Sequence, residues 1–226
     1  MNEMIMRMQS MSKVVAEALP INLERGLYDK FRSNTINLLV DNLQVCICAC
    51  RSEEADFAEY LKNARGWRSK ANDLDSLDTG LGVTLGDVLS QSGYLFNHTP
   101  HLKEIEYIQI CRNSPDFLNP LSAISYNLFL GDQPDKDLPT KFDKRLAKDV
   151  EAILALLENP QKGIVAAEKM WDRRKNANMH RWYGTGPAHD YLLDPLILCI
   201  LKYYKADFES DSIHVKGYRF LVKNGF

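Results

Sequence analysis

The sequence predicts a single all-α domain, a multi-helix, bundle-like fold that closes with a short extended C-terminal tail. Apolar residues recur at helical spacing along most of the chain, and this period is the main sequence signal for helix. The length of 226 residues fits one domain of ordinary size. Breakers such as Thr79–Gly82, Pro160 and Gly184–Pro187 divide the chain into segments of helix length.

The N-terminal part predicts a weakly packed arm followed by two helices. Residues 1–20 contain five methionines among polar residues, and we expect a loose, partly helical arm. The next helix is expected at about residues 22–50. Ser52, followed by two glutamates, is expected to cap a third helix whose apolar stripe runs from Phe57 to Ala71.

Five further helices are expected in the middle of the chain, at about residues 84–96, 102–112, 118–130, 146–157 and 161–176. Thr84 and Asp87 have the spacing of a capping box at the first of them. The stretch 131–140 is rich in Gly, Pro and Asp, and it is either a hinge or a long surface loop.

The C-terminal segment predicts a buried helix, an acidic turn and a tail. Asp194 and Pro195 are a typical cap and first residue for a helix at about 195–205. The acids Asp207, Glu209 and Asp211 follow, and residues 213–222 alternate enough to predict the extended tail. We expect these three acids to contact a basic partner, because complementary charge steers association.

Charge and composition exclude several classes of protein. The formal net charge is −2, so bulk charge favours neither nucleic acid nor an anionic membrane surface. No stretch approaches the ~20 apolar residues that span a bilayer, and the N-terminus lacks the apolar region of a secretory signal. The sequence therefore predicts a cytoplasmic protein that does not bind membranes.

The five cysteines are expected to be free core residues, and neither a metal nor a cofactor is predicted. Cys46, Cys48 and Cys50 lie in a helical apolar segment, with Cys46 and Cys50 on one face and Cys48 pointing away. Structural zinc sites use pairs spaced C-x₂-C with a second pair of ligands, and this spacing is absent from the sequence.

Two alternative functions have some support in the sequence. His189 and Asp190 form the dipeptide of helical metal-dependent phosphohydrolases, which require a further His and a further Asp at the same metal. The candidates for these ligands are His98, His101, His180, Asp194 and Asp207.

The second alternative is a nucleic-acid-binding module. Arg173, Arg174, Lys175 and Arg181 alternate with aromatic residues, a pattern that holds phosphates and stacks bases. The simpler interpretation is a helix whose Trp171 faces the core while its cations lie in solvent, and the small net charge makes nucleic-acid binding the weaker hypothesis.

The C-terminal third resembles immunity protein family 49 of bacterial polymorphic toxin systems. The matching pieces are a Trp/His-bearing segment from Trp171 to Tyr183, an apolar helix in DPLILCILKYYKADF, and an acidic turn with tail in ESDSIHVKGYRFL. The tail has Val215 to Tyr218 where the family has a Tyr-Leu-Pro turn. The resemblance implies a mostly helical protein that binds and neutralises a toxin encoded nearby, often a nuclease, without catalytic residues of its own.

Overall fold

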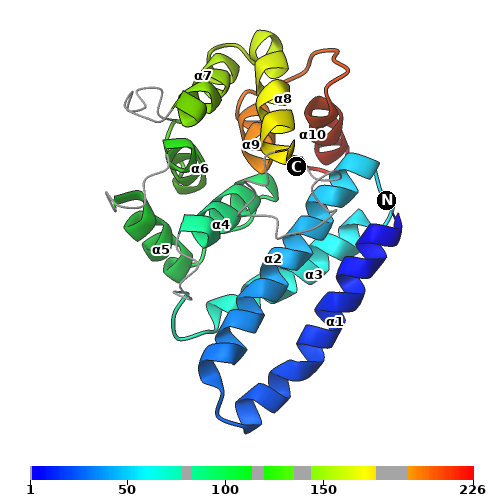
Figure 1. Ribbon diagram of the computed structural model, residues 1–226, viewed down its shortest axis with the longest axis vertical. Coiled ribbons are helices and arrows are strands. Elements are labelled where there is room, and N and C mark those ends of the chain that lie inside the picture. The colour runs from blue at the N-terminus through cyan, green and yellow to red at the C-terminus, as the bar shows by residue number, and fades with distance from the viewer. Residues whose placement is uncertain (1, 78–82, 114–119, 135–143, 177–192) are drawn as a thin grey trace.

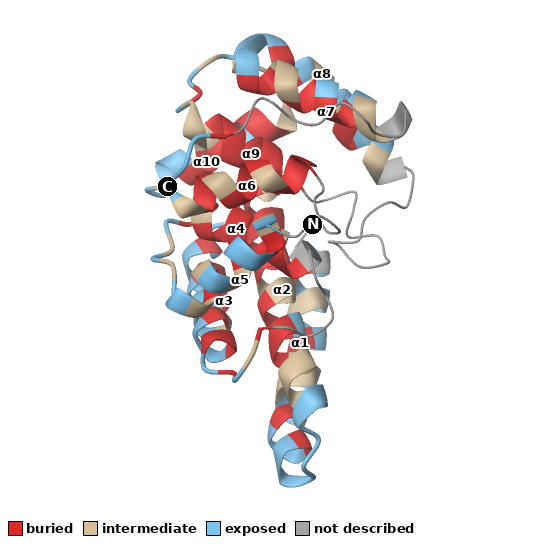
Figure 2. Cartoon of the chain, turned by 90° about the vertical axis from the view of Figure 1, so that its left-hand side faces the viewer, coloured by how far each residue is buried: buried red, intermediate tan, exposed pale blue. Residues whose placement is uncertain are grey.

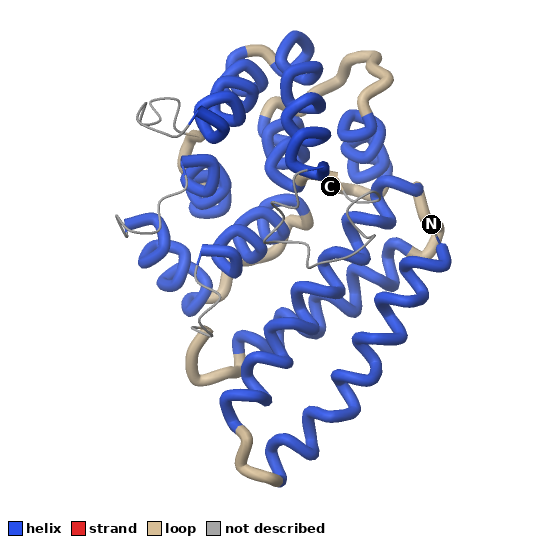
Figure 3. The backbone as a smooth tube through the Cα atoms, viewed as in Figure 1, coloured by secondary structure: helices blue, strands red, loops and turns tan. Residues whose placement is uncertain are grey.

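The computed structural model describes residues 2–77, 83–113, 120–134, 144–176 and 193–226 (Figure 1). These residues form ten α-helices and no strand (Figure 3), which confirms the predicted all-α domain. The helices are α1 Asn2–Glu24, α2 Tyr28–Ser52, α3 Phe57–Asn72, α4 Val83–Leu95, α5 Leu102–Asn113, α6 Pro120–Leu130, α7 Lys144–Glu158, α8 Pro160–Asn176, α9 Pro195–Tyr203 and α10 Ile213–Lys223.

One hydrophobic core runs through all of these helices, from Ile5 in α1 to Leu221 in α10. Helix α2 packs between α1 and α3, and α7 packs on α8. Helix α4 lies at the centre, against α6 and α9, and α10 packs on both α9 and α2. The C-terminal helix therefore joins the long N-terminal helices to the rest of the domain.

The N-terminal arm was predicted wrongly, because a regular helix runs to Glu24 instead of a loose segment that ends at residue 20. Its buried residues face α2, against which it packs along its length. The chain then turns at Gly26, whose φ of +69° favours glycine. The helix predicted from residue 22 consequently begins only at Tyr28.

Two of the three predicted helix caps were also wrong. Ser52 is the last residue of α2, and its hydroxyl donates a hydrogen bond back to the Cys48 carbonyl at 3.0 Å. Helix α4 already begins at Val83, so Thr84 lies inside the helix and is not its N-cap. The prediction for Asp194 is confirmed, since its carboxylate accepts the Leu196 amide at 2.9 Å and Pro195 follows it.

The extended C-terminal tail was also predicted wrongly, because residues 213–223 form helix α10. Ser212 caps this helix by accepting the backbone amides of His214 and Val215, each at 3.2 Å. The buried residues His214, Val215, Tyr218 and Leu221 follow helical spacing. Gly217 allows close packing, since a Cβ there would lie 2.3 Å from the Leu193 side chain.

All five cysteines are buried and free, as predicted, although Cys48 is buried together with Cys46 and Cys50. Burial raises the pKa of the Cys48 thiol to about 12, so the thiol form is favoured. Within the described residues, no group of three His, Cys, Asp or Glu side chains is placed to hold a metal ion. No described helix has both the length and the apolar character to cross a bilayer.

The possible hinge at 131–140 lies largely outside the described residues. Its first residue, Gly131, ends α6 with a φ of +85°. Asp132, the next residue, pairs with Arg112 of α5 at 2.9 Å. This ion pair fixes the beginning of the segment to the neighbouring helix.

Candidate partner-binding site

The three predicted contact residues lie together in the loop that joins α9 to α10. Asp207, Glu209 and Asp211 are all exposed, and the loop lies at the surface (Figure 2). Helix α9 ends just before it, with its apolar residues Leu196 to Leu201 buried in the core. The sequence prediction of a buried helix followed by an exposed acidic turn is confirmed.

Cations of α10 already pair with two of the three acids. Arg219 donates to both carboxylate oxygens of Glu209, at 3.0 and 3.3 Å, and to the Phe208 carbonyl at 2.9 Å. These hydrogen bonds lower the pKa of Glu209. Lys216 lies 3.8 Å from Asp211, whereas Asp207 has no ion pair within the described part of the chain.

The surface around the turn is consequently mixed in charge. Residues 202–226 contain five Lys or Arg and three Asp or Glu, which gives a formal local charge of +2. Asp207 is the carboxylate that remains most available to a basic partner. The cations beside it make the surface complementary to a partner that carries both signs of charge.

A pocket of about 560 Å³ opens between the turn and α10. Its apolar lining comes from Ala206, Tyr218, Val222 and Phe226, and charged residues including Asp207 and Lys205 surround it. An apolar centre with a charged rim is the usual anatomy of a protein–protein interface. A pocket of this volume has room for a drug-sized group, and hence for more than one side chain inserted by a partner.

The end of α9, the acidic turn and α10 together form what we call the α9–α10 corner. Lys202, at the end of α9, fixes the base of this corner to α4. Its ammonium donates to the carbonyls of Tyr94 and Leu95, at 2.9 and 2.8 Å, and to the Asn97 side chain at 2.7 Å. A cation is favoured at this position, because the last carbonyls of a helix lack partners and carry partial negative charge. Burial lowers the pKa of Lys202 to about 8.

His214 fixes the other side of the corner, although nothing in its local sequence marks it as a site residue. Its side chain is fully buried. Its Nδ1 lies 2.8 Å from a carboxylate oxygen of Glu168 in α8, and its Nε2 accepts the Asp194 backbone amide at 2.8 Å. Glu168 also accepts the Ser212 hydroxyl, so one carboxylate holds both the cap and the first turn of α10.

The geometry of His214 defines its chemistry. Because Nε2 accepts an amide proton, the ring is the neutral tautomer that carries its proton on Nδ1 and donates it to Glu168. Burial raises the pKa of Glu168, but hydrogen bonds from His214 and Ser212 outweigh it and bring the pKa to about 2. A catalytic histidine needs a nitrogen free to accept a proton from substrate or nucleophile. Both nitrogens here bind the protein, so the arrangement is structural.

The residues of the metal-hydrolase hypothesis are only partly described. His189, Asp190 and His180 lie outside the described residues. Asp194 caps α9 and lies 3.6 Å from Arg174, while Asp207 follows the opposite end of that nine-residue helix. Neither carboxylate belongs to a group of three His, Cys, Asp or Glu side chains placed to hold a metal ion within the described residues.

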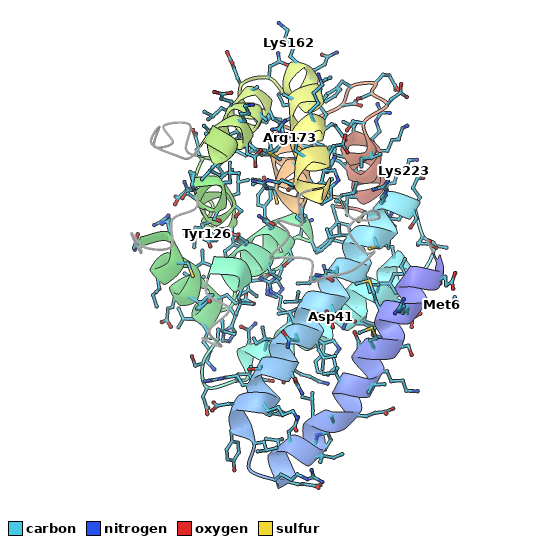
Figure 4. The ribbon with its side chains drawn as sticks, viewed as in Figure 1. Met6, Asp41, Tyr126, Lys162, Arg173 and Lys223 are labelled. Carbon is cyan, nitrogen blue, oxygen red and sulfur yellow. The ribbon has the colours of Figure 1, made fainter. Side chains whose placement is uncertain are left out.

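Two of the four cations of the nucleic-acid hypothesis bind a carboxylate of the protein itself, and the side chain of Lys175 is not among those that the structure describes. Arg173 and Arg174 both contact Asp149 of α7, at 3.1 and 3.0 Å. The expectation that both lie in solvent was wrong for Arg174, whose side chain is only 23 % exposed. Trp171 is buried as predicted, and Arg181 lies outside the described residues. Figure 4 shows Arg173 on α8, near the upper end of the domain.

A buried ion pair, which was also missed in the sequence, holds α3 to α5. Arg68 donates to both carboxylate oxygens of Glu104, at 2.8 and 3.1 Å, and Asn72 donates to one of them at 3.0 Å. The pKa of Glu104 falls to about 2, because hydrogen bonds from His98, Arg68 and Asn72 outweigh the effect of burial.

Comparisons of this chain with protein-family models, with curated proteins and with solved structures gave no match.

Proposed function

We propose that this chain is an immunity protein that binds a bacterial toxin, of the nuclease type, and neutralises it without catalysis. The observation that carries the proposal is the corner between α9 and α10, where exposed charges surround an apolar pocket. The resemblance of the C-terminal third to immunity proteins supports the same conclusion. A binding role requires a rigid, accessible surface, and Lys202 and His214 provide the rigidity here.

The direct experiment is co-expression with the product of the adjacent gene in a growth assay. We expect this chain to restore growth, and the purified proteins to form a stable complex by size-exclusion chromatography. Phe226→Ala with Val222→Asp, which alters the pocket lining, should weaken the complex. A neighbouring gene product that neither binds nor is neutralised would contradict the proposal.

The acidic turn has a matched control within the chain. Asp73 and Asp75 are exposed acids that follow α3, remote in sequence from the α9–α10 corner. Reversing their charge alters the net charge by the same amount per substitution as Asp207→Lys and Glu209→Lys. Only the substitutions in the turn should reduce neutralisation, if local complementarity and not overall charge steers the toxin.

A further inference from the structure

The outer face of α1 carries a row of side chains that no described helix covers. Three of its apolar members, Met11, Val14 and Ile21, are 63, 66 and 46 % exposed. With Arg7 and Ala18 they are spaced alternately by three and four residues, which places them along one side of the helix. Met6, labelled in Figure 4, is also exposed near the start of α1.

This outer row repeats the spacing by which α1 packs on α2. The inner row consists of Ile5, Met8, Ser12, Val15, Leu19 and Asn22, again at alternate steps of three and four, and all are buried or half-buried. The outer row is displaced by one position in the sequence, or about 100° around the helix. Helix α1 thus has two adjacent seams suited to helix packing, and α2 covers the inner one.

An acidic row borders the outer seam on the side away from α2. It consists of three acids, Glu3, Glu17 and Glu24, which with Ser10 recur every seven residues, and all four residues are exposed. Such flanking positions set the choice of partner in helix pairs, because opposite charges there attract and like charges repel. The seam from Arg7 to Ile21 is about 21 Å long, or roughly four helical turns.

We propose that this outer seam docks an amphipathic helix of a partner protein whose apolar stripe is flanked by Lys or Arg. Charge complementarity selects this occupant. A two-fold antiparallel pair of α1 helices would set one row of glutamates beside the other, which disfavours a second copy of this chain. A membrane surface fits poorly, since α1 has three Glu against Arg7 and Lys13, and interfacial helices are typically rich in cations.

The test uses two synthetic helical peptides of about four turns, with the same Leu and Ile stripe and with either Lys or Glu at the flanking positions. Fluorescence anisotropy with the full chain should give a Kd for the Lys peptide at least tenfold lower than for the Glu peptide. Met11→Asp with Val14→Asp should raise that Kd more than tenfold. Glu17→Lys should raise it severalfold, and more at low salt than at high salt.

Two substitutions elsewhere serve as matched controls. Ile110 on α5 and Val165 on α8 are 67 and 59 % exposed, so Ile110→Asp and Val165→Asp should leave the Kd unchanged. Equal affinity for both peptides, or a Kd insensitive to the α1 substitutions, would overturn the proposal. A chain that sediments as a dimer and dissociates with Val14→Asp would assign the seam to a second copy instead. The proposal does not depend on the toxin assignment, because the peptides test it alone.

Discussion

At the C-terminal end, α9 is held by hydrogen bonds from Lys202 to backbone carbonyls of α4, and α10 is held by the Glu168 side chain of α8, whereas α1 at the other end of the chain packs along α2. Asp194, His214 and Lys202 each satisfy backbone groups that would otherwise be buried without partners. On α1 the outer row meets no comparable neighbour in the described part of the chain. Hydrogen bonds within the chain thus occupy these polar groups of the C-terminal unit, whereas one face of α1 remains available to a partner.

The difference teaches that charged residues which resemble a binding site can instead stabilise the fold. Apolar residues that resemble ordinary helix residues can instead be exposed and available to a partner. Three aspartates or glutamates near the C-terminus resemble site residues, yet two of them are paired within the chain. Met11 and Val14 resemble ordinary helix residues, yet they are more than half exposed. The two regions therefore differ in how exposed their side chains are and in whether those side chains pair within the chain, and residue type alone does not reveal this difference.

The largest effect is expected for His214→Ala. The substitution leaves the Asp194 amide and the Glu168 carboxylate without their buried partner, which should lower the free energy of unfolding by about 3–5 kcal/mol. Urea denaturation measures it, with Lys216→Ala, an exposed change on the same helix, as control. A loss below about 1 kcal/mol would show that the contact does not fix α10.

A smaller change in the free energy of unfolding should distinguish substitutions in the inner seam of α1 from those in its outer seam. Leu19, 8 % exposed, faces α2, and Leu19→Ala should cost about 2–3 kcal/mol of unfolding free energy. Ile21→Ala, on the outer seam, should change it by less than about 0.5 kcal/mol. Equal losses for the two variants would mean that both seams are packed in the isolated protein.

The acid stability of the C-terminal unit should depend on Glu168. Its pKa of about 2 lies below the usual 4.5, so its contribution is present above pH 4.5 and is lost as the pH falls toward 2. Glu168→Gln should therefore lower the unfolding free energy by about 1–3 kcal/mol at pH 7, and the deficit should disappear near pH 2. A deficit that is constant with pH would contradict the charged contact.

Asp87 should show the opposite dependence. Burial raises its pKa to about 7, against the opposing influence of Ser122 and Tyr126. The folded protein then binds more protons than the unfolded chain between about pH 4 and 7, so this group favours unfolding as the pH rises through that range. Asp87→Asn should flatten the pH dependence of stability there, as measured by urea denaturation at several pH values.

The fold could be predicted well wherever apolar spacing alone decides it. The helix interiors and the Asp194–Pro195 start follow directly from local chemistry. The helix at 213–223 could not, because Tyr218, Phe220 and Val222 are spaced by two as in a strand, and the contacts of α8 with Ser212 and His214 that stabilise the helix form only in the folded chain. Local spacing also gave no information on Arg68 and Glu104, which meet only after folding.

The sequence predicted where the acidic turn lies, but it did not predict the cations that surround it and make the local charge mixed. The sequence places Asp207, Glu209 and Asp211 after an apolar helix, and they do lie exposed in one turn. That Arg219 and Lys216 would face two of them depends on α10 being a helix that turns these cations toward the loop. The pocket likewise depends on residues from α9, the turn and α10 together.

The most direct test of the proposed binding role is the rate at which this chain associates with an inactivated product of the adjacent gene, measured by stopped flow. Asp207→Lys, Glu209→Lys and Asp211→Lys together should slow association at least tenfold at low salt, with a smaller difference at high salt, because screening weakens the steering. Urea denaturation should show the variant to be folded. An unchanged association rate at low salt would contradict the assignment of this turn to partner binding.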